Sequence, residues 1–312
     1  MNSSSASLSH QPLGLHYLCL AASMALVGSY VTLSQQLVAV MGVTVLAWWR
    51  FALGALAMPH WLRKPADEPR LTLAVHGGLF LASLLGNVLF SLCMLAGVQR
   101  TSAVSAGVIL SFTPMAVALL SWWWLGERVA GRTWVGIALA VSGMALLGAE
   151  SRGGSPQHEI GGFTDNTIGN ALILAAVLCE ASYAVIGKRL TRTLGPRRIT
   201  ALLNLWGWGL MTPLAWTALP SFNPATLRFA EGAALLFYAL AASVGTVWLW
   251  MTGLQRVPAS QAGVFTAMLP LSACTVAWLL GHTPSRLQWL ALGLTLAGIA
   301  VSNWIQRETR HR

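Results

Sequence analysis

Two charged side chains stand in stretches of sequence that are otherwise apolar. Glu180 lies in the run LILAAVLCEASYAVIG, and Arg50 lies in LAWWRFALG. A charged residue at the centre of a membrane span costs about 3 kcal/mol on insertion scales, so it must face the protein interior and be paired, neutralised by protonation or bound to a ligand. For Glu180 we weigh a structural ion pair against a part in substrate binding or proton coupling, and we favour the second.

Three roles fit Arg50. It could pair with Glu180. A rise of about 1.5 Å per residue places Arg50 about 11 Å and Glu180 about 18 Å below the outer ends of their predicted helices. It could bind a substrate carboxylate, or it could hydrogen-bond backbone carbonyls. Of these, we favour a structural role.

Other polar and aromatic side chains also interrupt the apolar runs. Tyr30 and Tyr183 occupy matching places, in GSY and ASY. Taken singly, such a residue is more often packed and hydrogen-bonded inside the protein than in contact with a ligand. The candidates for substrate contact or proton coupling are Glu180, Arg50, Tyr30, Tyr183, Asn87, Ser111 and Trp206, and further polar or aromatic residues within the apolar runs are His76, Asn204 and Tyr238.

The chain shows no pattern of an enzyme or of a metal site. Its four cysteines all lie in apolar stretches, where a thiol packs as a small apolar group. No phosphate-binding loop, HExxH motif or nucleophile with its partners occurs. We therefore expect no metal, no cofactor and no catalysis, and the sequence argues against ATP-driven transport.

One stretch of the chain occurs twice. The segments are Gly97–Gly126, GVQRTSAVSAGVILSFTPMAVALLSWWWLG, and Gly253–Gly281, GLQRVPASQAGVFTAMLPLSACTVAWLLG. They align without a gap up to Pro114 on Pro270, and one deletion in the second copy then aligns Trp134 with Trp289. Each copy is long and apolar enough to span a membrane, and repeats of such helices are typical of transporters.

The repeated prolines and arginines are candidates for a role in transport. A proline inside a helix frees a backbone carbonyl, which in a membrane needs protein or water nearby. We therefore expect Pro114 and Pro270 to mark two helices that line a central cavity, rather than two kinks used only for packing. Arg100 and Arg256 follow a glutamine at equivalent places, where they could act in gating or anchor the chain at the interface.

The amino-acid composition indicates a membrane protein. Of its 312 residues 55% are hydrophobic and only 9% are charged, against about 25% charged in soluble proteins. The net charge of +10 does not indicate nucleic acid, because the basic residues lie in short loops between apolar runs. The sequence thus predicts an all-α membrane protein.

Ten transmembrane helices are predicted. They are Leu13–Leu33, Val43–Trp61, Leu71–Met94, Ser102–Trp124, Trp134–Ala149, Ile168–Gly187, Ile199–Leu219, Glu231–Leu254, Ala259–Leu280 and Leu287–Ile305. Fourteen basic residues then lie on the side of the N-terminus and four on the other side. The positive-inside rule accordingly predicts that both termini are cytoplasmic, in a multi-pass protein of the cell inner membrane.

A polar, glycine-rich linker divides the chain into two halves. It covers residues 151–167, SRGGSPQHEIGGFTDNT, on the outer side. Residues 1–150 and 168–312 then hold five spans each. Because five is odd, the halves have opposite orientations, and this 5+5 inverted repeat is a design that exposes one site to either side in turn.

The repeat resembles the drug/metabolite transporter superfamily, in its bacterial ten-span EamA-type branch. The resemblance rests on QRTSAVSAGVILSFTPMAVALLSWWWLGER with its turn Gly126–Arg128, on Trp134–Gly136, on the triplet Trp49–Phe51 and on the 5+5 layout. The second copy has Gly281–Thr283, GHT, where the first has GER. A role for the acidic turn therefore depends on Glu127 alone.

The resemblance implies a secondary transporter of the cytoplasmic membrane, with a cavity lined by spans one, three, four, six, eight and nine. Bacterial members mostly export amino acids, their derivatives or other small metabolites. We expect an exporter of a small polar metabolite, such as an amino acid, an amino-acid-derived compound or a metallophore, driven by the proton gradient or by the substrate's own gradient. The alternatives are an importer or facilitator and a non-transporting membrane scaffold. Monomer and homodimer are both compatible with the sequence.

Overall fold

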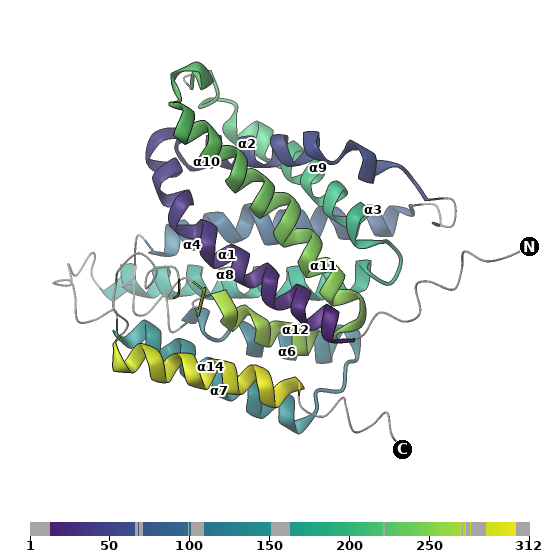
Figure 1. Cartoon of the computed structure of the whole chain (residues 1–312), viewed down its shortest axis with the longest axis vertical. Coiled ribbons are helices and arrows are strands. Elements are labelled where there is room, and N and C mark those ends of the chain that lie inside the picture. Colours follow the sequence, from purple (N-terminus) through teal and green to yellow (C-terminus); the bar gives the residue numbers. More distant parts are fainter. Residues whose placement is uncertain are drawn as a thin grey trace, which may run out of the picture.

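The computed structural model describes residues 13–65, 68, 71–98, 100, 109–150, 163–220, 222–269, 271–272, 275 and 285–303. Within these ranges all regular structure is helical, and no strand occurs. The helices run along and against one another in one bundle (Figure 1). The predicted all-α class is confirmed for this part of the chain.

The first half of the chain forms α1 (Leu13–Met41), α2 (Val43–Ala57), η1 (Pro59–Leu62), α3 (Leu73–Ser83), η2 (Leu84–Leu89), α4 (Phe90–Val98), α6 (Thr113–Leu125) and α7 (Gly131–Glu150). The second half forms α8 (Phe163–Leu190), α9 (Pro196–Ala215), η4 (Pro224–Thr226), α10 (Phe229–Ala239), η5 (Leu240–Gly245), α11 (Thr246–Arg256), α12 (Ala259–Val264), η6 (Phe265–Ala267) and α14 (Arg286–Asn303). Here η2 and η5 are π-helical turns, and η1, η4 and η6 are 3-10 turns.

Several of these helices have the length and composition of membrane spans. Four continuous segments are long and apolar enough, namely Leu13–Tyr30, Leu73–Met94, Thr167–Leu190 and Phe229–Arg256. Shorter apolar helices cover Val43–Ala57, Gly131–Leu146 and Arg286–Ser302. Each segment overlaps a predicted span, and large apolar side chains such as Trp123 and Phe229 are exposed on the outside. Such a surface is suited to lipid, as expected for an integral membrane protein.

Close packing between α7 and α14 follows the repeat. A Cβ atom at Gly136 would lie 2.7 Å from the carbonyl oxygen of Gly298, and one at Gly143 would lie 2.7 Å from that of Ala291. In the repeat alignment Gly136 matches Ala291 and Gly143 matches Gly298, so each helix offers the same two positions to the other. Small residues at such positions let membrane helices approach to backbone contact.

A second pair of glycines behaves in the same way. Gly97 at the end of α4 faces Ile173 of α8, where a Cβ atom would lie 2.7 Å from the Ile173 Cδ1. Its equivalent, Gly253 of α11, faces Leu20 of α1 just as closely. Ile173 and Leu20 are themselves equivalent, each ten residues before the tyrosine of its ASY or GSY motif.

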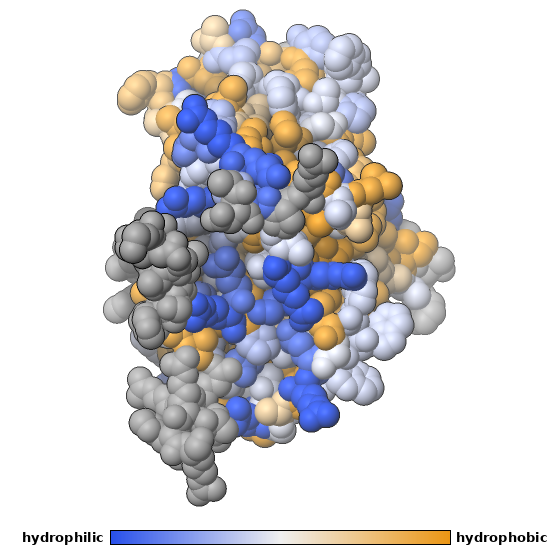
Figure 2. All heavy atoms as spheres, turned by 90° about the vertical axis from the view of Figure 1, so that its right-hand side faces the viewer, coloured by the Kyte–Doolittle hydropathy of each residue, from blue (hydrophilic) through white to orange (hydrophobic). Residues whose placement is uncertain are grey.

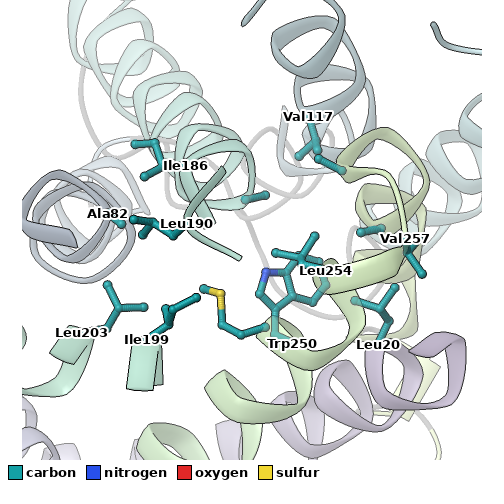
Figure 3. Close-up of a cluster of buried hydrophobic side chains, with 14 of the residues drawn as sticks. Leu20, Ala82, Val117, Ile186, Leu190, Ile199, Leu203, Trp250, Leu254 and Val257 are labelled. Carbon is teal, nitrogen blue, oxygen red and sulfur yellow. The ribbon is translucent and has the colours of Figure 1, made fainter. Parts of the chain in front are cut away.

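The largest apolar core lies where α1, α3, α6, α8, α9, α11 and α12 meet. Figure 3 shows Trp250 and Leu254 of α11 turned towards Leu20 of α1, Leu190 of α8 and Ile199 of α9. All five side chains are buried. Because lipid tails are as apolar as leucine, close packing rather than exclusion of water holds such a core together.

The end of the bundle at which α1 begins and α14 ends is hydrophilic. Figure 2 looks onto this end and shows polar and charged side chains gathered between apolar flanks. Exposed basic residues in the loops and helix ends of the chain include Arg63, Lys64, Arg128, Arg189, Arg192, Arg197 and Arg256.

Candidate functional site

Arg50 of α2 lies between the two π-helical turns. Its Nε donates a hydrogen bond to the Ser243 Oγ of η5 at 3.3 Å, and its Nη2 donates to the Asn87 Oδ1 of η2 at 3.3 Å. The Ser243 hydroxyl also contacts the Arg50 carbonyl oxygen at 3.3 Å. The guanidinium carbon lies 4.6 Å from the centre of the Phe51 ring, a distance typical of a cation–π contact. These neighbours fix the position of the guanidinium.

Buried polar groups support this arrangement from behind. The Asn87 Nδ2 donates to the Ser83 Oγ at 3.4 Å, and the Ser83 hydroxyl donates to the Leu203 carbonyl at 3.2 Å. The Asn204 Nδ2 donates to the Ser243 carbonyl at 2.8 Å. These hydrogen bonds fix the orientations of Asn87 and of the backbone at Ser243, as expected of polar networks in a low-dielectric interior.

Two tyrosines at equivalent places in the repeat complete the cluster. The ring of Tyr30 in α1 meets that of Tyr238 in α10 edge to face, with centroids 5.4 Å apart. The ring of Tyr183 in α8 packs on Gly86 of η2, where a Cβ atom would lie 2.5 Å from the ring. Glycine at position 86 is therefore required for this contact. Both Tyr30 and Tyr183 interact electrostatically with Arg50 and with Glu180.

Glu180 occupies the same face of α8 as Tyr183, because three residues separate them along the helix. Its side chain keeps part of its surface exposed, as does that of Arg50. The ion pairs among the described residues are Arg198–Glu68 and Arg228–Glu231. The pair between Arg50 and Glu180 that the sequence suggested is therefore not formed. The two groups instead share Tyr30 and Tyr183 as electrostatic neighbours.

The other sequence candidates lie in varied surroundings. Trp206 packs within the apolar core with its ring 5.3 Å from that of Phe80. Ser111 is buried in a turn before α6. Pro114 stands in the first turn of α6, where a missing N–H leaves no hydrogen bond unmade. The expected kink is thus a break ahead of the proline, and Pro270 lies outside the described residues.

The two candidate gating arginines are both exposed. Arg100 donates from its Nη1 to the Ala96 carbonyl at the end of α4, at 2.9 Å. Arg256 is the last residue of α11. Their part in gating stays a prediction.

The turn between α11 and α12 is held by two charged side chains. The Glu127 carboxylate accepts hydrogen bonds from the backbone N–H groups of Ala259 and Ser260, at 3.0 and 3.2 Å, and from the Ser260 hydroxyl at 3.1 Å. The Lys188 Nζ donates to the carbonyls of Leu254 and Val257, at 2.6 and 2.8 Å. An anion at a helix start and a cation at a helix end both suit the helix dipole.

A groove of about 720 Å³ lies elsewhere, between α6 and α8. Its lining is apolar apart from Asn170 and includes Leu174, Val177 and Leu178 of α8, whereas Glu180 is not one of the lining residues. Such a lining is suited to lipid rather than to a polar ligand.

Sequence reasoning missed two residues of these clusters. Ser243 contacts Arg50, but a serine in an apolar span is unremarkable by itself. The repeat carried the missing signal, because Ser243 aligns with Asn87 when Gly253 is placed on Gly97. Lys188 is one of the fourteen basic residues predicted on the side of the N-terminus, and its contacts with Leu254 and Val257 depend on the fold of α11 and α12.

Comparison with known proteins identifies the family. The sequence profile of the EamA-like transporter family matches residues 14–149 and again residues 167–304. The chain belongs to the EamA-like transporter family. The suspected resemblance is confirmed, and a member of this family is a transporter with a small-molecule substrate and a membrane setting, not an enzyme.

Individual relatives of this EamA-like transporter cover nearly the whole chain. The uncharacterized transporter YetK of Bacillus subtilis is 32% identical over 92% of this chain and 86% of its own length. The threonine/homoserine exporter RhtA of Escherichia coli K12 is 32% identical over 93% of this chain and 92% of its own. A protein of known crystal structure, 17% identical, superimposes with a TM-score of 0.70 over 93% of this chain and 97% of that one.

Proposed function

We propose that this transporter exports a small polar metabolite, an amino acid or an amino-acid-derived compound, by alternating access. The observation that carries the proposal is the polar cluster within an apolar bundle. Arg50 and Glu180 have opposite charges, are not paired with each other and share Tyr30 and Tyr183 as neighbours. A small molecule with both a negative and a positive group would neutralise both residues.

We further propose ten transmembrane helices in a 5+5 inverted repeat, with residues 1–150 and 168–312 as the two halves and 151–167 as the external linker. The double match of the family profile supports this division. The reciprocal packing of α7 and α14, and the equivalent contacts of Gly97 and Gly253, support a two-fold relation between the halves. In such transporters the substrate site lies where the repeats meet, and rocking of one half against the other exposes it to each side.

The proposed location is the cytoplasmic membrane, with both termini in the cytoplasm. The excess of basic residues on the N-terminal side supports this orientation. The hydrophilic end seen in Figure 2 agrees with it. The protein would act as a monomer or a homodimer, with no nucleic acid and no cofactor.

The similarity to RhtA makes amino acids the first substrates to examine. RhtA is an exporter of threonine and homoserine, and it matches this chain over almost the full length of both. Shared fold and family do not by themselves fix a substrate. Threonine and homoserine are therefore starting points within the amino-acid class.

A metabolite comparison tests the proposal. A strain lacking the protein and its parent are grown in several media, and metabolites are measured inside the cells and outside. We expect one or more amino compounds to accumulate inside the deletion strain and to be depleted outside, with recovery when the wild-type gene is restored. The reverse pattern would indicate an importer. No difference in any medium would favour a scaffold without transport.

A further inference from the structure

The two π-helical turns occupy equivalent positions in the two halves. The sequence alignment that places Gly97 on Gly253 also aligns η2 (Leu84–Leu89) with η5 (Leu240–Gly245), residue for residue. A π turn is rare in helices and is frequently found at functional sites. Asn87 and Ser243 are the matching residues of the two turns, and both contact the guanidinium of Arg50. One cation thus bridges the same element of both halves.

The charge on this guanidinium has no counter-ion among the described residues. Its hydrogen-bond partners Ser243, Asn87 and Tyr238 are neutral, and its further polar neighbours are Tyr30 and Tyr183. Arginine stays protonated in proteins, and a charge inside a membrane protein is unfavourable without compensation. Since a guanidinium has five N–H donors, hydrogen-bonding capacity remains beyond these three hydrogen-bond partners.

We propose that Arg50 binds the carboxylate of the transported metabolite, and that Asn87 and Ser243 are positioning residues that hold its guanidinium between the π turns. The inference rests on the proposed transport function and assigns the chemistry of its site. Guanidinium and carboxylate form paired, charge-assisted hydrogen bonds, which are stronger than neutral ones.

The second charge of the cluster favours a carboxylate over a phosphate. Glu180 interacts with the same two tyrosines as Arg50. A phosphate dianion would exceed the charge of Arg50 and be repelled by an ionised Glu180. A molecule with one carboxylate and one ammonium group balances both residues, with its ammonium beside Glu180. The substrate class is thus an α-amino acid or a compound that retains both groups.

Transport by the purified full-length protein in liposomes tests this assignment. The probe is a labelled mixture of L-amino acids, and the competitors are the unlabelled amino acids, their methyl esters and phosphate monoesters. With wild-type protein we expect both classes to compete at least about tenfold more weakly than the acids. The esters lack the carboxylate of the charge-assisted pair, and the phosphates carry a second negative charge that an ionised Glu180 repels.

The variants separate binding from positioning. Arg50→Gln should raise KM for the acids by about tenfold to hundredfold and remove the discrimination against the methyl esters. Asn87→Ala and Ser243→Ala should raise KM several-fold with little change in the maximal rate. Ser142→Ala, at an exposed serine of α7 that bonds only to its own helix, is the matched control and should match the wild type.

Several results would overturn the assignment. Unchanged KM and unchanged ester discrimination in Arg50→Gln would make Arg50 structural. If Arg50→Gln does not fold, the other two variants still test the proposal. Unchanged KM and unchanged ester discrimination in both Asn87→Ala and Ser243→Ala would contradict the positioning role. Preferred transport of phosphates, or of cargo without a carboxylate, would reject the ligand class while leaving transport itself intact. A wild-type protein that moves no compound would reject both proposals.

Discussion

At the scale of single residues, we propose that Glu180 links transport to protons. It shares α8 with Tyr183 and interacts electrostatically with Tyr30 and Tyr183, which in turn interact with Arg50. A carboxylate that gains a proton loses its hold on an ammonium group, so binding of substrate and of a proton would compete at Glu180. Such competition is a simple means of coupling the two.

The test at this scale is Glu180→Gln, which fixes the side chain in a neutral form. We expect at least about a tenfold loss of transport, because the charge-assisted contact to the ammonium is gone, and a residual rate that no longer depends on pH. The measurement is initial rate against pH in liposomes. A variant that transports with the wild-type pH profile would rule out coupling through Glu180.

Sequence reasoning identified most of the cluster but not its geometry. Arg50, Glu180, Asn87 and the two tyrosines stand out because polar groups are rare in apolar spans. The contact between Arg50 and Ser243 joins residues far apart in the chain. It depends on the π turn that contains Ser243, and no residue pattern predicts a π turn. Trp206 was selected for the same reason as the tyrosines, yet its ring packs on Phe80 in the apolar core.

At the scale of elements, the positions of most helices could be predicted, because charged or turn-forming residues separate the apolar runs. The predicted end of the first span at Leu33 was wrong, since α1 continues to Met41. The interruptions within the helices could not be predicted. Spans three and eight were predicted as single helices, and each contains a π turn. The single helix expected across Pro114 is interrupted by a turn at Ser111 and Phe112, after which α6 begins at Thr113.

The close contact of α7 and α14 yields a stability prediction. Gly298→Ala would place a Cβ atom close to the carbonyl of Gly136 and 2.9 Å from the Ala140 nitrogen. We expect a destabilisation of about 1–3 kcal/mol, as for other overpacked sites, measured as a lower Tm in detergent. Gly293→Ala, on the same helix with open space around it, is the control and should leave Tm unchanged or raise it. Equal Tm values for the two variants would contradict the close packing.

A second element-scale prediction concerns the start of α12. Glu127→Ala removes the acceptor for the Ala259 and Ser260 N–H groups. Hydrogen bonds to a charged group contribute about 1.5–3 kcal/mol, so we expect a lower Tm and a smaller loss in Glu127→Gln. The neighbouring exposed Arg128 offers a control, and Arg128→Gln should have the wild-type Tm. If Glu127→Ala is as stable as that control, the carboxylate does not hold the helix.

At the scale of the whole molecule, the two-fold relation that we propose between the halves does not extend to every residue. Glu127 of the first copy holds α12, whereas the second copy has His282 at the corresponding place, outside the described residues. Arg50 comes from one half alone but contacts the π turns of both. A site shared in this way would sense the relative position of the halves, which is what alternating access requires.

The central claim is export of amino compounds from the cytoplasm, and inside-out membrane vesicles test it most directly. Export from cells corresponds to uptake by such vesicles. We predict that vesicles containing the wild-type protein accumulate a labelled mixture of L-amino acids when energised, that Arg50→Gln and Glu180→Gln vesicles accumulate at least about tenfold less, and that Ser142→Ala vesicles equal the wild type. Uptake at the level of vesicles without the protein, or equal uptake by all four proteins, would contradict the account.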